Sequence, residues 1–210
     1  MHDPREPRDA HDQRRPTEAG SDDPGLLLDP DCFTFTKAIE DGYETFLAEL
    51  NQLDSDEFLR WPHEDAFDGE WLVYPLVEHC RPEGFEVDME RHARRCPHSV
   101  EFLSRIPRLR GAAFSRLTPG SRIHPHCDHE VKGVIRAHLG LHIPDGSNLY
   151  FDETHHRWAE GKLLLFNGQE RHSVVNESPV PRDILMVDIE LVLREAAVAG
   201  VEWVPWCPER

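Results

Sequence analysis

Between residues 109 and 193 the chain is a succession of short apolar runs, each ended by turn-forming residues, and this pattern constrains the fold most. The turn clusters read TPGS, PDGS, FNGQE and NESPVPR, which are rich in the residues that tight turns require. Six or seven strands joined by turns favour an antiparallel β-sandwich or jelly roll over alternating strand and helix units. The expected strands cover residues 112–117, 122–127, 134–143, 148–151, 162–166, 172–175 and 184–193.

The N-terminal half of the chain has a helical pattern instead. From residue 33 to residue 53, apolar side chains recur at spacings of three and four, which predicts one amphipathic helix over residues 34–50. Two shorter helices are expected over residues 87–96 and 99–106, each ended by a proline. The predicted fold class is therefore mainly β, with helices gathered on the N-terminal side.

One apolar segment, WLVYPLV at residues 71–77, fits either a strand or a buried turn. Its Pro75 argues against a central strand, because proline cannot donate a hydrogen bond to a neighbouring strand.

The domain organisation follows from composition and length. Residues 1–25 are dense in Asp, Glu, Arg and Pro and have almost nothing to bury, so we expect a disordered tail there. The remaining residues, 26–210, suffice for one domain but not for two large ones. Within that domain we expect helical support from residues 33–108 and a β core from residues 109–193.

The charge balance excludes some partners. The chain has 23 Lys and Arg against 40 Asp and Glu, a formal net charge of −17. Such an excess repels phosphate backbones and anionic membrane surfaces, so we expect neither nucleic acid nor a membrane as a partner. There is no run of eighteen apolar residues and no apolar stretch typical of a signal peptide at the N-terminus, which predicts a cytoplasmic protein.

The five cysteines support the same compartment. They are odd in number, widely spread and include no C-x-x-C pair, so the sequence indicates neither a disulfide framework nor a zinc finger.

The segment RIHPHCDHE, residues 122–130, is the most informative about chemistry. Side chains two apart on a strand share a face, so His126 and Asp128 should project together. A further histidine, His172, begins a later expected strand 46 residues after His126. Two imidazoles and one carboxylate are the ligand set of a facially capped non-haem Fe(II), which keeps positions open for a co-substrate and O₂.

An arginine stands ten residues after the second histidine. Because the turn NESPVPR separates them, a hairpin would return Arg182 to the side of His172. A guanidinium there is suited to bind one end of a dicarboxylate in a two-pronged manner while the other end chelates the metal.

These stretches resemble the aspartyl/asparaginyl β-hydroxylase family, which are Fe(II)- and 2-oxoglutarate-dependent oxygenases with a double-stranded β-helix core. The similarity runs from about residue 112 to residue 190. The matching segments in this sequence are FSRLTPGSRIHPHCD, IRAHLGLHIP, WAEGKLLLF, RHSVVN and PRDILMVDIE.

The resemblance implies roles for individual residues. Iron would be bound by His126 and His172, and 2-oxoglutarate would be contacted by Ser115, His138 and Arg182. Arg136 looks like the family residue that meets the carboxylate of the substrate. The implied reaction consumes O₂ and 2-oxoglutarate, releases succinate and CO₂, and hydroxylates an sp³ carbon of a free amino acid or of an aspartyl or asparaginyl residue in a peptide.

Two positions depart from the family pattern. Vertebrate members have glycine where this chain has Asp128, so the site here resembles the complete triad of bacterial amino-acid hydroxylases. Members of the first kind also carry a second arginine near Arg136, whereas this chain has Val134 there. The loss of that charge weighs against an aspartyl substrate.

Two other interpretations stay open at this point. His124 shares the expected face of His126, and together with Glu130 and the later His172 it loosely matches the paired cupin motifs. That arrangement would hold Mn, Ni or Fe without 2-oxoglutarate and would leave Arg182 without a role. The second is a ligand-binding or structural β-sandwich whose metal site has no redox function. The oligomeric state is not indicated by any pattern.

Overall fold

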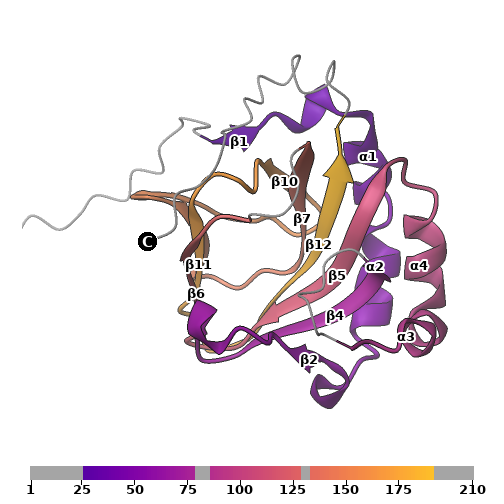
Figure 1. The fold of residues 1–210 in the computed structure, drawn as a ribbon, viewed down its shortest axis with the longest axis horizontal. Helices are drawn as coiled ribbons and strands as arrows, with labels where there is room; N and C mark the ends of the chain where they lie inside the picture. The colour runs from indigo at the N-terminus through magenta and orange to yellow at the C-terminus, as the bar shows by residue number, and fades with distance from the viewer. Residues whose placement is uncertain (1–25, 79–85, 129–132, 192–210) are drawn as a thin grey trace, which may run out of the picture.

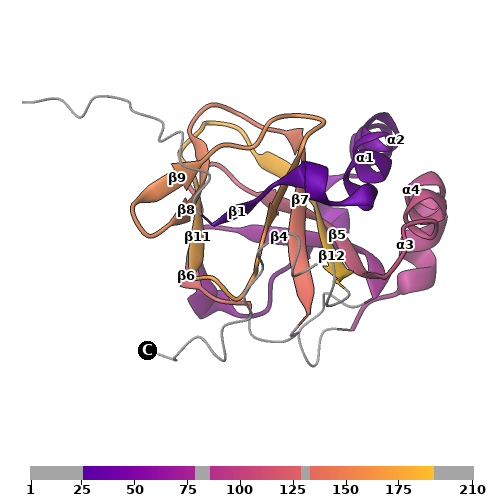
Figure 2. The ribbon, with the colours of Figure 1, turned by 90° about the horizontal axis from the view of Figure 1, so that it is seen from above.

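The computed structural model describes residues 26–78, 86–128 and 133–191 of the 210-residue chain. They form two facing antiparallel sheets with helices packed outside the larger one (Figures 1 and 2). The tail expected over residues 1–25 lies outside the described residues. Within the described residues, no helix has both the length and the apolar character that a membrane span requires.

Twelve strands build the two sheets, and the chain passes between the sheets as it advances. The larger sheet has the order β1-β10-β7-β12-β5-β4-β2, and the smaller one β3-β6-β11-β8-β9. This alternation of antiparallel strands is the winding of a double-stranded β-helix, which confirms the predicted fold class. The first four strands are β1 (Leu27–Leu28), β2 (Leu59–Arg60), β3 (Phe67–Asp68) and β4 (Trp71–Glu78). The later eight are β5 (Leu109–Leu117), β6 (Arg122–His126), β7 (Val134–His142), β8 (Ser147–Phe151), β9 (Thr154–His156), β10 (Leu163–Phe166), β11 (His172–Asn176) and β12 (Arg182–Glu190).

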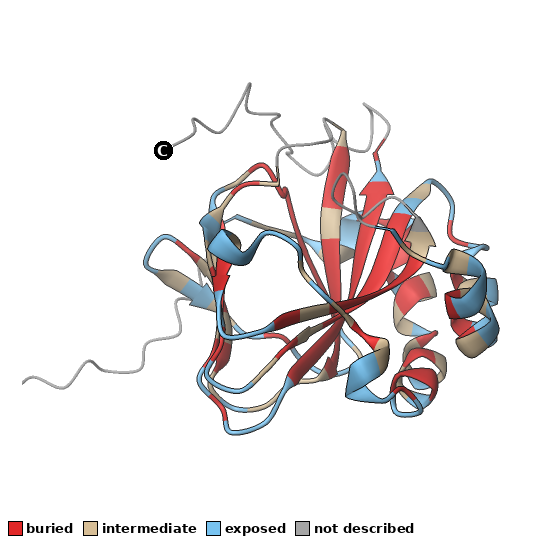
Figure 3. Cartoon of the chain, turned by 60° about the horizontal axis from the view of Figure 1, so that its bottom comes forward, coloured by how far each residue is buried: buried red, intermediate tan, exposed pale blue. Residues whose placement is uncertain are grey.

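Side-chain alternation sorts the residues of the large sheet between two cores. On β12, Leu185 and Val187 join the core beneath the helices, whereas Ile184 and Met186 join the core between the sheets. This strand is buried on both faces because β5 and β7 flank it and a layer covers each side (Figure 3). Polar residues in phase with Ile184 and Met186 therefore point into the space between the two sheets.

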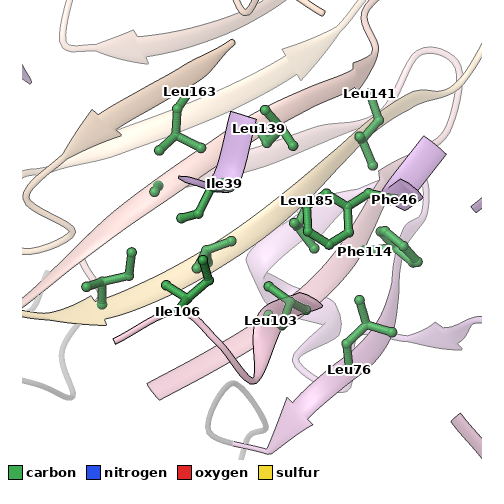
Figure 4. Packing of buried hydrophobic residues seen from close by; sticks show 14 of the residues in the cluster. Ile39, Phe46, Leu76, Leu103, Ile106, Phe114, Leu139, Leu141, Leu163 and Leu185 are labelled. Atoms are coloured by element: carbon green, nitrogen blue, oxygen red, sulfur yellow. The ribbon is translucent and has the colours of Figure 1, made fainter. Parts of the chain in front are cut away.

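Four helices cover the outer face of the large sheet. They are α1 (Thr34–Glu40), α2 (Tyr43–Leu50), α3 (Met89–Arg95) and α4 (Pro97–Leu103). Ile39 and Phe46 from the first two lie over Leu139 and Leu185 of the sheet (Figure 4).

The single helix expected over residues 34–50 is wrong in one respect, since it is divided into α1 and α2 by Asp41 and Gly42. A Cβ atom at Gly42 would lie 2.5 Å from the ring of Phe46 and 2.8 Å from that of Phe102. Glycine is therefore required where the two helices meet the neighbouring aromatic side chains. The apolar period alone does not show such a break.

The ambiguous segment around Pro75 is a strand, β4 (Trp71–Glu78), between β5 and the two-residue β2 (Leu59–Arg60). Strand β2 pairs only with Leu72 and Val73, so Pro75 faces no partner on that side. The pairing with β5 shifts register just after Pro75. Pro75 is therefore tolerated because no backbone group of β2 lies opposite it, although β4 is not an edge strand in the sheet order.

Each of the seven expected strands corresponds to a strand of the structure, but four strands were not predicted: β1 (Leu27–Leu28), β2, β3 (Phe67–Asp68) and β9. All four have two or three residues, too few to show a period. The cysteine expectation is also wrong in part. Cys32 and Cys96 are free thiols, but Cys127 is disulfide-bonded, which its spacing from other cysteines does not reveal.

Candidate active site

Two histidines face each other where β6 ends and β11 begins. The strands pair antiparallel with His172 directly opposite His126. Their ring centroids are 4.3 Å apart, and His172 is almost completely buried. Sheet register therefore brings together two residues that are 46 positions apart in the sequence.

Backbone carbonyls determine the tautomers of both rings. Nδ1 of His126 is 2.8 Å from the carbonyl oxygen of His124, and Nδ1 of His172 is 2.8 Å from that of Glu170. A carbonyl oxygen only accepts, so each Nδ1 must carry the proton. Each Nε2 then has a free lone pair, which is the form of imidazole that binds metals.

Asp128 completes a cluster of possible metal ligands. Its Oδ1 lies 3.7 Å from Nε2 of His126, and its Oδ2 lies 3.7 Å from Nε2 of His172. One ligand atom from each residue falls within 4.8 Å of the other two, and among the described residues this is the group with such a geometry.

A close approach to the turn between β10 and β11 holds Asp128 in place. Its backbone N–H donates to the carbonyl oxygen of Gly168 at 2.7 Å. A Cβ atom at Gly168 would lie 2.8 Å from Oδ2 and 3.1 Å from the Cβ of Asp128, so only glycine leaves room for this carboxylate.

Burial keeps the inner histidine neutral. Desolvation lowers the pKa of His172 to about 4, an effect larger than the opposing attraction of Asp128. At pH 7 the imidazole is therefore uncharged and available as a ligand without first losing a proton.

A buried arginine lies at the start of β12. Arg182 is 1% exposed, and its Nε and Nη1 atoms are buried without a hydrogen-bond partner in the described part of the chain. The neighbouring Asp183 points to the opposite face, where it binds Arg116 and His142. Burial lowers the pKa of Arg182 to about 10, which leaves it charged at neutral pH. An interior cation in this state is suited to bind an anion.

Trp158 connects this arginine to His138. The guanidinium carbon of Arg182 lies over the indole, 5.1 Å from the ring centroid. Indole Nε1 donates to Nδ1 of His138 at 3.3 Å, so the proton of the neutral imidazole must be on Nε2. That Nε2 is buried and has no hydrogen-bond partner among the described residues.

Burial, followed by the charges of Arg136 and Arg182, lowers the pKa of His138 well below its usual value. The ring is therefore neutral and presents one N–H donor toward the interior. Phe166 packs edge-on between the two histidines, 5.1 Å from the ring of His138 and 4.9 Å from that of His172. Phe166 therefore contacts both the metal-ligand cluster, through His172, and the group around Arg182, through His138.

Ser115 faces the same interior space. It lies on β5 opposite Ile184, one row from Arg182 on the same face. Its Oγ accepts a hydrogen bond from Nε1 of Trp71 at 3.0 Å, so the hydroxyl proton remains to donate elsewhere.

Arg136 is placed between two carboxylates. Its Nε and Nη2 donate to Asp188 at 2.9 and 3.0 Å, and its Nη1 lies 2.9 Å from Oδ2 of Asp128. The structure therefore places Arg136 at the predicted site. Its guanidinium is already engaged by two carboxylates of the protein instead of being open to a substrate carboxylate.

The sequence analysis missed three residues of this site: Asp188, Trp158 and Gly168. A signal existed for Asp188, because this carboxylate inside the apolar run ILMVDI is in phase with Arg182 on the same strand. The alternative ligand His124 turns away from the cluster, since its ring nitrogens contact the carbonyl of Asp65 and the carboxylate of Asp68. Glu130, its expected companion, lies outside the described residues.

Comparison with known proteins identifies the family. The model of the aspartyl/asparaginyl β-hydroxylase family matches residues 37–191, a range that includes β5 to β12 in full. The chain belongs to the aspartyl/asparaginyl β-hydroxylase family. Membership confirms the resemblance drawn from the sequence motifs.

Curated relatives within the family differ in what they are named for. The ornithine lipid ester-linked acyl 2-hydroxylase of Rhizobium tropici is 28% identical over 186 residues, which cover 81% of this chain and 62% of that protein. The human aspartate β-hydroxylase domain-containing protein 2 is 32% identical over 138 residues, 61% of this chain and 36% of that protein. The chain thus spans less than two thirds of the length of these two relatives.

Among solved structures, a 2OG-Fe(II) oxygenase family oxidoreductase from Burkholderia pseudomallei aligns with a TM-score of 0.48 and 13% identity. The alignment covers 70% of this chain and 77% of that one.

Proposed function

We propose that this protein is an Fe(II)- and 2-oxoglutarate-dependent dioxygenase that hydroxylates an sp³ carbon and releases succinate and CO₂. The observation that carries this proposal is the buried guanidinium of Arg182, two of whose nitrogens have no hydrogen-bond partner among the described residues, in the same interior space as a His-Asp-His cluster. A ligand cluster alone fits many metalloproteins. A metal-binding cluster together with an interior cation that lacks its anion fits an acid that binds at both places.

In this proposal the iron ligands are His126, Asp128 and His172. Their donor set of two neutral imidazoles and one carboxylate suits Fe(II) and leaves coordination positions open. A ferrous ion held there would supply the electrons that O₂ needs to attack an unactivated C–H bond. The protein's own part is to hold both Nε2 lone pairs inward and to keep solvent away from the reacting carbon.

The same proposal assigns 2-oxoglutarate to Arg182, His138 and Ser115. Arg182 offers two free N–H groups, His138 offers Nε2–H, and Ser115 offers its hydroxyl. Three donors on one interior face match a carboxylate, whose two oxygens accept several hydrogen bonds. The cupin alternative without 2-oxoglutarate is disfavoured, because it leaves this buried cation uncompensated and needs His124, which points elsewhere.

The substrate class is the finer part of the proposal. An amino acid, free or as an aspartyl or asparaginyl residue, is the expectation from the family motifs, with Arg136 as its carboxylate receptor. A second candidate is the acyl chain of a lipid. It is favoured by the engagement of Arg136 with Asp188 and Asp128 and by the coverage of the relative named as an acyl 2-hydroxylase. Cytoplasmic location and the lack of a nucleic-acid or membrane partner stay predictions.

An anaerobic titration tests the co-substrate assignment. Fe(II) and 2-oxoglutarate added without O₂ should produce the weak visible charge-transfer absorption of an iron-bound keto acid. Arg182→Gln should require far more 2-oxoglutarate for the same absorption, with Fe(II) affinity nearly unchanged. The absence of absorption in the unaltered protein, with metal bound, would refute 2-oxoglutarate as co-substrate.

A product screen then separates the substrate classes. With Fe(II), 2-oxoglutarate and air, candidate amino acids, acidic peptides and acyl lipids are examined by mass spectrometry for the gain of one oxygen atom. Succinate is measured in parallel, and Arg182→Gln is the negative control. Oxygen gain in the acyl lipids alone would overturn the amino-acid expectation.

A further inference from the structure

We propose that Arg136 is a positioning residue that holds the Asp128 ligand in place, is itself held by Asp188, and does not receive a substrate carboxylate. The proposal rests on the proposed function insofar as Asp128 is a metal ligand. It departs from the role that the family motifs imply for Arg136.

Sheet register places Arg136 and Asp188 together. Strands β7 and β12 pair with Arg136 directly opposite Asp188. The two side chains form a two-pronged ion pair, with Nε at 2.9 Å from Oδ1 and Nη2 at 3.0 Å from Oδ2. Such a paired fork fixes the plane of the guanidinium, so the direction of the remaining Nη1 is fixed as well.

The remaining nitrogen lies within ion-pair distance of the metal-ligand cluster. Nη1 of Arg136 lies 2.9 Å from Oδ2 of Asp128. The two histidine ligands are each held through Nδ1 by a backbone carbonyl, and Arg136 provides the corresponding outer contact for the carboxylate. Asp128 lies two residues beyond the end of β6, where its backbone N–H is held by the carbonyl oxygen of Gly168 and its carboxylate lies beside Arg136. Outer partners of this kind orient metal ligands.

The charges argue against a substrate carboxylate on Arg136. One guanidinium already serves two carboxylates, so the three side chains carry a formal net charge of −1. A substrate carboxylate on Arg136 would have to displace Asp188 or Asp128. Either displacement would break an ion pair of a largely buried carboxylate, which is unfavourable.

A second arginine–aspartate pair on β12 provides a matched control. Arg116 on β5 lies directly opposite Asp183 on β12 and forms the same fork, at 2.7 and 3.0 Å. Its side chain is 13% exposed, compared with 17% for Arg136. The Arg116 pair lies on the opposite face of β12, where its described polar contacts are with Ser55 and His142 and not with the His-Asp-His cluster. It therefore reports the structural effect of losing such a pair without the effect on the metal ligand.

The experiment compares Arg136→Lys with Arg116→Lys in Mn(II) binding, followed by electron paramagnetic resonance without any turnover. Lysine keeps the positive charge but loses the fork, so the electrostatic field at the metal is nearly retained. Arg136→Lys should weaken Mn(II) binding by about 10-fold or more, as is typical when an outer partner of a ligand is lost. Arg116→Lys should change it by less than about twofold, although both variants should unfold at lower temperature.

Equal Mn(II) affinity in Arg136→Lys and the unaltered protein would overturn the proposal. If Arg136→Lys does not fold, Asp188→Glu tests the same fork from the other side with unchanged charge, and Asp183→Glu is its control. Failure of the unaltered protein to bind Mn(II) would instead refute the metal centre of the proposed function. The two failures are thus distinguished by the behaviour of the unaltered protein.

Discussion

Replacing Arg182 with methionine should make the ligand-free protein more stable and abolish its response to 2-oxoglutarate. The guanidinium is buried, two of its nitrogens have no hydrogen-bond partner in the described structure, and the adjacent carboxylate of Asp183 faces away. Methionine has a similar length and adapts to irregular space, so it can occupy the site without a charge. A residue kept for binding at the expense of stability behaves in this way.

The pKa of Arg182 sets the magnitude of the gain. Burial lowers this pKa from 12.5 to about 10. At 1.36 kcal/mol per unit, the charged form is destabilised by roughly 3 kcal/mol. Loss of the contact between the guanidinium and the face of Trp158 returns about 0.5 to 2 kcal/mol of this. The free energy of unfolding should therefore rise by about 1 to 2.5 kcal/mol.

Urea denaturation with and without Mn(II) and 2-oxoglutarate measures both effects. At a concentration 100 times its dissociation constant, the ligand should stabilise the unaltered protein by about 2.7 kcal/mol. The Arg182→Met variant should gain almost nothing from 2-oxoglutarate. Arg116→Met is the control, because it removes a paired arginine and leaves the buried Asp183 with His142 alone, so stability should fall by up to about 3 kcal/mol.

Two results would refute the reasoning about Arg182. A less stable Arg182→Met variant would mean that the guanidinium is compensated in the free protein. Equal stabilisation of variant and unaltered protein by 2-oxoglutarate would mean that the acid binds elsewhere.

Three further predictions concern the groups around this site. Trp158→Phe removes the donor that sets the His138 tautomer. The dissociation constant of 2-oxoglutarate, measured by calorimetry, should therefore rise about 5-fold, which is the equivalent of one hydrogen bond. An unchanged constant would contradict the tautomer assignment. Gly168→Ala pushes against the Asp128 carboxylate, so Mn(II) affinity should fall in the unaltered background but not in Asp128→Gly, and a fall in both would place the effect elsewhere. In chelator-treated protein, the free energy of unfolding should decrease as pH falls from about 6.5 to about 4, because the unfolded chain takes up a proton that buried His172, with its pKa of about 4, does not. His172→Gln should remove up to about 3 kcal/mol of this decrease. An unchanged pH dependence in this variant would assign the decrease to other groups.

Local patterns in the sequence were sufficient for most of the fold. The alternation of apolar and polar residues and the turn clusters predicted seven of the twelve strands, because side-chain direction on a strand repeats every two residues regardless of partners. The same patterns did not show the break between α1 and α2. Glycine is required at position 42 because of a close contact with Phe102 from another helix. They also left β4 undecided, since the tolerance for Pro75 depends on how short its neighbour β2 is.

For the candidate site, the sequence by itself determined which chemical groups are available and which face of its strand each one occupies. His126, His172 and Arg182 were named from spacing, and Asp188 was within reach of the same reasoning. Only the tertiary structure decided which of these groups are paired. Arg136 and Arg182 are both interior arginines on neighbouring strands, yet one lies opposite a carboxylate and the other does not. Partnership depends on the register between strands that are far apart in the chain, and a local period contains no information about register.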